Sequence, residues 1–292
     1  MADELLVAAS GDSLFQFLQP SRLTAVVDVG ANPIDGDPPY KPMLERGLCT
    51  IVGFEPQIEA LASLNQRKGP METYFPDVLG DGHPHTLHIC AAPGMTSLLK
   101  PDPRMLSLFR LFPEFGRVHS TQPVVTKRLD DITEIKNLDF LKIDVQGSEL
   151  SVFRSGRHKL ADAMVIQTEV SFLPLYEHQP LFAEIDLELR SQGFIPHTFA
   201  AVKRWAIAPL MVNNDPYQGL NQLLEADVVY VRDFNRTDAL SDEQLKHLAL
   251  ISHHCYRSFD LALRCVLILE QRGRLKKGSD ERYTQLIGHR NR

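Results

Sequence analysis

Three acidic residues stand at or near the ends of short apolar runs, where they could serve one ligand. Asp28 lies in VVDVGAN, Glu55 in GFEP and Asp144 in DFLKIDVQGSEL. In a parallel sheet, ligands bind at the carboxyl ends of the strands. A carboxylate there has two acceptor oxygens, which suit the two neighbouring hydroxyls of a ribose. We therefore expect a nucleoside-type ligand with Glu55 on its ribose. The alternative is that Glu55 only stabilises the start of the following helix.

Further polar residues mark the same predicted cleft. Gly30 has no side chain, so backbone could approach a ligand closely, and Asn32 offers an amide in the same turn. Lys142 precedes Asp144 in an otherwise apolar run, and its burial costs free energy unless the charge is partnered or faces a site. Glu169 follows the apolar run 163–168 and should face the cleft too. Considered without the other motifs, the turn at Gly30 fits a nucleotide-binding role and a purely structural role equally well.

The elements that must position these residues are short apolar runs alternating with helical patterns. Strands are expected at Thr24–Val29, 50–54, 139–143 and 163–168, and helices at 39–46, 57–66, 148–153 and 181–191. Runs that are apolar throughout are typical of a parallel sheet covered on both faces. No helical period separates 194–201 from 228–232, so we expect an antiparallel pair at the sheet edge.

The last part of the chain has a helical pattern. Ser241-x-x-Gln244 is a capping box, which marks a helix start. Beyond it, residues spaced alternately by three and four form a seam: Leu245, Leu248, Ser252, Cys255, Phe259, Ala262, Val266 and Leu269. The seam predicts a helix or helical hairpin on the chain's own core or, alternatively, a homodimer contact. From Arg272 onward we expect a solvated, partly disordered basic tail. We divide the chain into a domain at 1–235 and an extension at 236–292.

Composition excludes several classes of protein. The formal net charge of -6 argues against nucleic acid as a partner, because duplex-binding proteins usually carry a basic field. The cysteines Cys49, Cys90, Cys255 and Cys265 form no Cys-x-x-Cys pair and are expected to be reduced thiols. The N-terminus has no secretory pattern, and no run approaches the roughly 20 apolar residues of a membrane span. We expect a cytoplasmic protein.

Five short motifs, taken in order, carry a family resemblance. VDVGAN, GFEP, LDDI, DFLKIDVQGSEL and QTEV together resemble the FkbM family of methyltransferases over residues 24–234. The resemblance implies a class I methyltransferase fold, which is an α/β fold with a mostly parallel seven-stranded sheet and an antiparallel edge strand. It also implies S-adenosylmethionine as methyl donor and, as acceptor, a hydroxyl on a sugar or other small metabolite.

The resemblance also implies roles for individual positions. Asp28, Gly30 and Asn32 would border the methionine part of the cofactor, and Glu55, followed by Pro56, would hold the ribose. Asp77 or Val78 would lie near the adenine, and Asp144 beside the reacting methyl. Two positions depart from the family pattern: Ile34 stands where many members have glycine, and Gln146 stands where many have glutamate. The second departure weakens any expectation of a carboxylate pair for metal binding.

Transfer to a hydroxyl needs a base within hydrogen-bond reach. Asp144 and Glu169 are the expected catalytic residues, with His178 and His197 as weaker candidates. We expect no metal site, because His83, His85 and His88 lack a matching acidic or cysteine partner and His253-His254 lie on the predicted C-terminal helix. Trp205 is expected at the surface or at the rim of the site.

Residues 94–116 form an insertion rich in Met, Leu and Phe, and this insertion is either an apolar lid over the acceptor or ordinary core packing. Two other functions stay open. A nicotinamide-dependent oxidoreductase shares the strand–turn–helix and the acid after the second strand, but the turn lacks Gly-x-Gly-x-x-Gly. A non-catalytic scaffold that kept the fold is the other, since fold does not fix activity.

Overall fold

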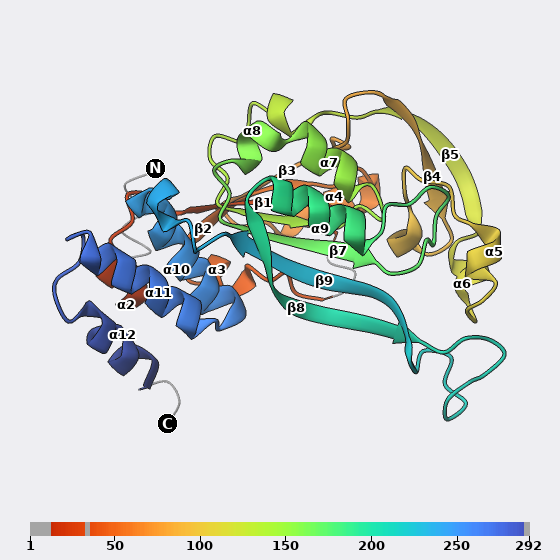
Figure 1. Ribbon diagram of the computed structural model, residues 1–292. Helices are drawn as coiled ribbons and strands as arrows, with labels where there is room; N and C mark the ends of the chain where they lie inside the picture. Colours follow the sequence, from red (N-terminus) through yellow and green to blue (C-terminus); the bar gives the residue numbers. More distant parts are fainter. Residues whose placement is uncertain (1–12, 33–35, 289–292) are drawn as a thin grey trace.

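A seven-stranded sheet forms the centre of the protein, in a computed structural model that describes residues 13–32 and 36–288 (Figure 1). The strand order is β3-β2-β1-β6-β7-β9-β8. The strands are β1 (Thr24–Val29), β2 (Cys49–Phe54), β3 (Glu72–Phe75), β6 (Phe140–Ile143), β7 (Val165–Ser171), β8 (Phe194–Trp205) and β9 (Gln222–Arg232). The four predicted apolar strands are present, and they pair in parallel as β1 with β2, β1 with β6, and β6 with β7.

The only reversal of direction described in this sheet is at β9, which pairs antiparallel with both β7 and β8. The predicted antiparallel pair is therefore confirmed. The antiparallel strand itself lies one position inside the edge, because the chain places β8 outermost before β9 returns between β8 and β7.

Helices cover both faces of the sheet. They are α2 (Ser13–Leu18), α3 (Lys41–Leu44), α4 (Ile58–Arg67), α5 (Pro103–Leu106), α6 (Phe112–Phe115), α7 (Glu149–Ser155), α8 (Arg157–Leu160), α9 (Phe182–Ser191), α10 (Asp242–Tyr256), α11 (Phe259–Gln271) and α12 (Ser279–Gly288), with short 3₁₀ turns at Pro93–Met95, Leu129–Asp131 and Thr237–Ala239. Successive strand residues point to opposite faces, so Val26 joins the core under α10 and α11, and Val27 joins the core under α7 and α9.

The C-terminal seam is a helical hairpin on the chain's own core. Ser241 caps α10 as predicted, since its Oγ accepts a hydrogen bond from the Gln244 amide and the Gln244 side chain accepts one from the Ser241 amide. The helix breaks at Arg257, whose φ of 53° is left-handed, and α11 folds back against α10. Most of the seam side chains are buried in the chain itself, so they offer no surface to a second copy.

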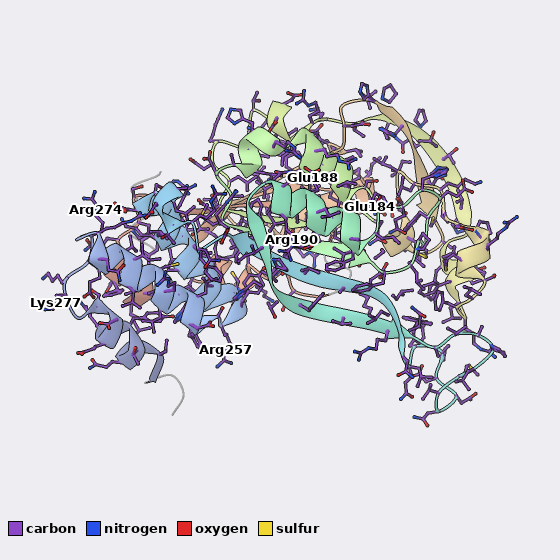
Figure 2. The ribbon with its side chains drawn as sticks, in the orientation of Figure 1. Glu184, Glu188, Arg190, Arg257, Arg274 and Lys277 are labelled. Atoms are coloured by element: carbon purple, nitrogen blue, oxygen red, sulfur yellow. The ribbon has the colours of Figure 1, made fainter. Side chains whose placement is uncertain are left out.

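The expectation of a solvated, partly disordered tail is wrong in one respect, because residues 279–288 are ordered. These residues form α12, and Tyr283 is fully buried with its hydroxyl 2.9 Å from Nδ1 of His253. A single buried tyrosine docks this helix, although the remaining residues of the helix are mostly polar. The number of charged residues in the segment gave no indication of that tyrosine. Figure 2 shows Arg274 and Lys277 on the outer side of the segment between α11 and α12.

A smaller sheet stands beside the main one. β4 (Pro84–Cys90) and β5 (Val118–Val125) pair antiparallel, and the chain between them carries α5 and α6. Figure 1 shows β8 and β9 continuing past the main sheet as an arm toward α5 and α6. Trp205 on this arm packs against Phe112 with ring centroids 4.9 Å apart, so it is not a surface aromatic. Among the described residues, no helix is long and apolar enough to cross a membrane.

Candidate active site

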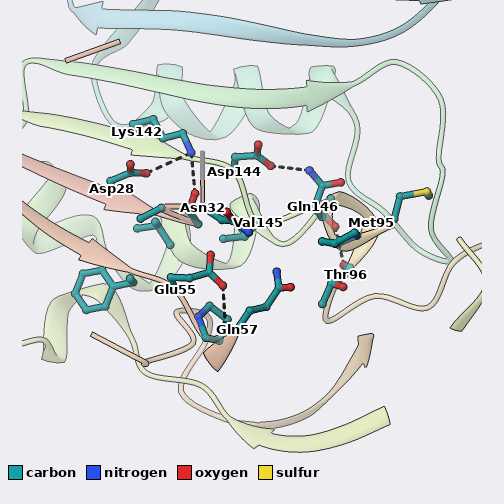
Figure 3. Close-up of a pocket in the computed structure, with 18 of the residues that line it drawn as sticks. Asp28, Asn32, Glu55, Gln57, Met95, Thr96, Lys142, Asp144, Val145 and Gln146 are labelled. Carbon is teal, nitrogen blue, oxygen red and sulfur yellow. Dashed lines mark hydrogen bonds and ion pairs between the residues drawn. The ribbon is translucent and has the colours of Figure 1, made fainter. Parts of the chain in front are cut away.

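One cavity of about 300 Å³ opens where β1, β2 and β6 end (Figure 3). Asp28, Glu55 and Asp144 all line it. The other predicted cofactor-site residues line it as well: Gly30, Asn32, Pro56, Asp77 and Val78. Glu169, the second predicted catalytic acid, is absent from the described lining and lies behind Gln146. Ile34 lies outside the described residues, so its effect on the turn is not described.

The turn after β1 requires glycine for a steric reason. Gly30 has a φ of +77°, and a Cβ built on it would stand 1.9 Å from the backbone oxygen of Asp144. The amides of Gly30 and Ala31 both donate to the Phe54 carbonyl, at 3.0 and 3.1 Å. Gly30 therefore lets the turn cross directly against the end of β6. From the sequence we expected glycine at this position so that a ligand could approach the backbone. In the structure the close neighbour of Gly30 is the chain's own backbone at Asp144.

Asp28 is buried and compensated from two sides. Its Oδ2 accepts a hydrogen bond of 2.6 Å from the Tyr40 hydroxyl, and its Oδ1 is 3.3 Å from Nζ of Lys142. Lys142 also donates to the Gly30 carbonyl at 2.8 Å. Burial raises the pKa of Asp28, and the Lys142 charge and the Tyr40 hydrogen bond oppose that rise. The partner that burial of Lys142 requires is therefore Asp28. The contact of Tyr40 with Asp28 could not be predicted from the sequence.

Glu55 lies both at the start of a helix and at the cavity. Its Oε1 accepts a hydrogen bond of 2.7 Å from the Gln57 amide at the start of α4, and the side chain also lines the cavity. Burial raises its pKa, and hydrogen bonds from the backbone of Gln57 and Asn32 lower it. Asp77, farther along the cavity, forms an ion pair of 2.7 Å with Nζ of Lys127.

Asp144 and Glu169 are joined by the side chain of Gln146. Its Nε2 donates to Oδ1 of Asp144 at 2.7 Å and to Oε2 of Glu169 at 3.0 Å. Glu169 also lies 3.3 Å from Nζ of Lys203. Burial raises the pKa of Glu169 well above its ordinary value, with a further rise from the charges of Asp144 and Glu225. Glu169 is thus a buried partner of Asp144, one layer behind the cavity wall.

Charged residues of the last two strands also line the cavity, and the sequence analysis did not predict them. Lys203 on β8 and Glu225 and Asp227 on β9 face the cavity, and Lys203 pairs in register with Glu225. The available signal was the alternation of Glu225 and Asp227 in the apolar segment LLEADVVYV, which repeats the pattern of Lys142 and Asp144. Charged residues at every second position of an apolar strand mark the face that meets a site.

Part of the cavity lining is apolar. It includes Met95, Phe112, Phe115 and Leu175, of which the first three belong to the 94–116 insertion. Within the same insertion Leu106 and Phe109 are buried in a core cluster. The insertion therefore packs into the core, as one of the two interpretations predicts, and also contributes to the cavity wall.

The remaining histidine candidates lie elsewhere. Within the described lining neither His178 nor His197 occurs, and His197 is hydrogen-bonded to Oγ of Ser258 at 2.7 Å. His85 pairs with Asp81 at 2.8 Å. Across residues 13–32 and 36–288, no group of three or more His, Cys, Asp or Glu side chains is arranged to hold a metal ion.

The cavity is strongly acidic. Its lining carries seven carboxylates (Asp28, Asp37, Glu55, Asp77, Asp144, Glu225 and Asp227) against two ammonium groups (Lys142 and Lys203). Concave sites lined by one sign of charge concentrate ligands of the opposite sign. Such a lining favours a cationic ligand and opposes a pyrophosphate.

The sheet order, the antiparallel β9 inside the edge, and a cavity at the ends of the first strands define a class I methyltransferase fold. The family model described as the methyltransferase FkbM domain matches residues 28–196, more than half of the chain. The chain belongs to the FkbM methyltransferase family.

Individual relatives are more distant. The chain is 29% identical over 175 residues to the 2-O-methyltransferase NoeI of Sinorhizobium fredii (strain NBRC 101917 / NGR234), covering 56% of this chain and 70% of that protein. Among solved structures it is similar to an FkbM methyltransferase of Methylobacillus flagellatus KT, at 13% identity and a TM-score of 0.38, covering 72% of this chain and 43% of that one. It is also similar to magnesium protoporphyrin IX methyltransferase of Synechocystis PCC 6803, at 11% identity and a TM-score of 0.37, covering 79% and 77%. Scores this low add nothing to the fold assignment.

Proposed function

We propose that this chain is an S-adenosylmethionine-dependent O-methyltransferase acting on a hydroxyl of a sugar or other small metabolite. The observation that carries the proposal is the single cavity where Asp28, Glu55 and Asp144 meet in a member of the FkbM family. The relative named as a 2-O-methyltransferase supports oxygen as the methyl acceptor.

The lining residues fit the proposed cofactor in charge and in donor chemistry. A cavity with an excess of carboxylates suits a molecule that carries a sulfonium and an ammonium group. Glu55 would hold the ribose hydroxyls, Asp77 and Val78 would border the adenine, and the Gly30–Asn32 turn would border the methionine part. When bound, the cofactor supplies an already activated methyl group, so the protein mainly aligns donor and acceptor.

Asp144 is the residue that we assign to the acceptor's proton. It lines the cavity, whereas Glu169 is absent from the described lining and lies behind Gln146 and Lys203. A base must come within hydrogen-bond reach of the hydroxyl that it deprotonates, and of the two acids Asp144 meets that condition. Glu169 then supports Asp144 from behind and does not contact the substrate.

The lining combines charged side chains with aromatic rings. Lys203, Glu225 and Asp227 belong to the first group, and Phe112 and Phe115 to the second. A sugar ring presents both hydroxyls and an apolar face of C–H groups, which suits such a mixed lining. An anionic acceptor is disfavoured, because Lys203 is already committed to Glu169 and Glu225 at 3.3 and 3.7 Å.

The two alternatives are not favoured. The acid-rich lining would repel the pyrophosphate of a nicotinamide cofactor, and the turn at Gly30 lacks the glycine pattern that binds one. A non-catalytic scaffold has no need for a buried carboxylate pair beside an open cavity, because burying such groups costs free energy.

The test combines binding with detection of product. We expect S-adenosylhomocysteine to bind in calorimetry, NAD to fail, and Glu55→Gln to lose about 10- to 100-fold in affinity, since a hydrogen bond to a charged group contributes about 1.5–3 kcal/mol. Glu59→Gln, an exposed position in the first turn of α4, is the matched control and should bind normally. Incubation of a cell extract with labelled cofactor should yield a product heavier by one CH2. Unchanged affinity in Glu55→Gln would remove Glu55 from the site, and binding without any labelled product would favour the scaffold.

A further inference from the structure

Gln146 occupies an unusual backbone conformation at the centre of the site. Its φ is 54°, in the left-handed region that residues other than glycine rarely adopt. Its backbone oxygen accepts a hydrogen bond of 2.6 Å from Oγ of Ser97, which is almost completely buried. A non-glycine residue persists in such a conformation only where its surroundings enforce it, and such positions cluster at functional sites.

Every polar group of the Gln146 side chain is used. One amide nitrogen donates to both Asp144 and Glu169, at 2.7 and 3.0 Å, and Oε1 accepts a hydrogen bond of 3.1 Å from the buried Tyr176 hydroxyl. The two acids fix which way the amide faces, because the reverse orientation would place Oε1 against their oxygens. The Tyr176 hydroxyl, which also contacts the Met95 carbonyl at 3.3 Å, lies on the Oε1 side. The amide therefore presents its N–H groups to two carboxylates.

We propose that Gln146 is a positioning residue that orients Asp144 toward the substrate. The inference rests on the proposed function, in which Asp144 stands beside the reacting methyl. An amide can hold two carboxylates at once because it donates two hydrogen bonds and adds no charge. A carboxylate at this position would bring three like charges within hydrogen-bond distance, and such groups cannot all be ionised.

A comparison of two ligands tests whether the Asp144 carboxylate is held beside the sulfur. S-adenosylmethionine has a positive sulfur, and S-adenosylhomocysteine is nearly the same molecule without that charge. The ratio of their affinities therefore reports the charge next to the sulfur, while general damage to the site weakens both ligands alike. Other charged groups also face Asp144 and Glu169, and all of them are kept in every variant below: Asp28 on β1, Lys142 on β6, Glu149 on α7, Lys203 on β8 and Glu225 on β9.

The experiment measures both affinities by calorimetry on the full chain. In Gln146→Leu we expect the preference for S-adenosylmethionine over S-adenosylhomocysteine to fall about tenfold below that of the wild-type protein, because the hydrogen bond that holds the Asp144 carboxylate beside the sulfur is lost. Gln122→Leu on the exposed strand β5 makes the same substitution away from the site and should behave as wild type.

The possible outcomes are distinct. An unchanged preference in folded Gln146→Leu overturns the inference and leaves the methyltransferase proposal intact. A wild-type protein that binds neither ligand overturns both. Should Gln146→Leu fail to fold, Tyr176→Phe keeps the amide but removes the hydroxyl that donates to it. We expect a fall of about threefold in the same preference, and a wild-type preference in that variant also overturns the inference.

Discussion

The contact between Gly30 and the end of β6 gives the sharpest test of how the site is built. Gly30→Ala adds a Cβ 1.9 Å from the Asp144 oxygen, where real Cβ atoms stay beyond 3.0 Å, so the two backbone segments must separate by roughly 1 Å. The left-handed φ of +77° adds a second cost, because L-residues lose about 1–2 kcal/mol there. The forced separation should cost about 1–3 kcal/mol more. We expect a total loss of about 2–5 kcal/mol in the free energy of unfolding.

The chain offers a control that separates the two costs. Gly273 has a φ of +70° and no atom within 4 Å of its would-be Cβ, so Gly273→Ala should lose only the conformational part. Urea unfolding of both variants gives the difference directly. Gly30→Ala should also lose ligand affinity, measured as a smaller rise in melting temperature with S-adenosylhomocysteine, because displacement of about 1 Å disrupts a site. Equal losses of stability in the two variants would refute the close crossing of the turn and β6.

Two further perturbations test the interior around the site and the C-terminal extension. Glu149 is buried, and burial raises its pKa from the ordinary 4.5 to about 7. The folded state therefore holds a proton that the unfolded state has released, and stability should fall by up to about 3 kcal/mol as pH rises from 4.5 to 7. Glu149→Gln should remove this fall in urea titrations at successive pH values, and an unchanged slope would contradict the assignment. Tyr283→Ala should lose about 3–5 kcal/mol and expose α12 to proteolysis, because it empties a fully buried aromatic position; a stability within 0.5 kcal/mol of wild type, as for a surface substitution, would mean that α12 is not docked.

The sheet could be predicted from the sequence because its central strands contain short runs of apolar residues that do not alternate with polar ones. β1, for example, has Ala25, Val26 and Val27 in succession, as expected for a parallel strand covered on both faces. The smaller sheet could not be predicted in this way, since β5 is exposed at nearly every position and carries no periodic pattern. Its pairing with β4 depends on contacts between segments that the local sequence does not encode.

The acids at the strand ends could also be predicted, whereas their partners could not. Asp28 could be identified by its position after an apolar run. Its partner Tyr40 comes from the segment before β2, and nothing in the local sequence links the two. Lys203 meets Glu169 only because β9 lies between β7 and β8, and the register of β8 on β9 shifts between Lys203 and Arg204. A shift of one residue exchanges the two faces of a strand, so such contacts follow from the assembled sheet and not from spacing.

The arrangement of the two lysines gives Asp144 a special place among the acids of the cavity. Lys142 forms an ion pair with Asp28, and Lys203 forms ion pairs with Glu169 and Glu225. Both ammonium groups are therefore already paired with carboxylates other than that of Asp144. Asp144 receives a neutral amide instead, and in the described part of the chain no lysine or arginine lies within ion-pair distance of it. The half-buried Asp144 carboxylate would therefore gain from a positive charge in the ligand. Under the proposed function the sulfonium of S-adenosylmethionine would supply that charge, and S-adenosylhomocysteine, which lacks it, would gain less from Asp144.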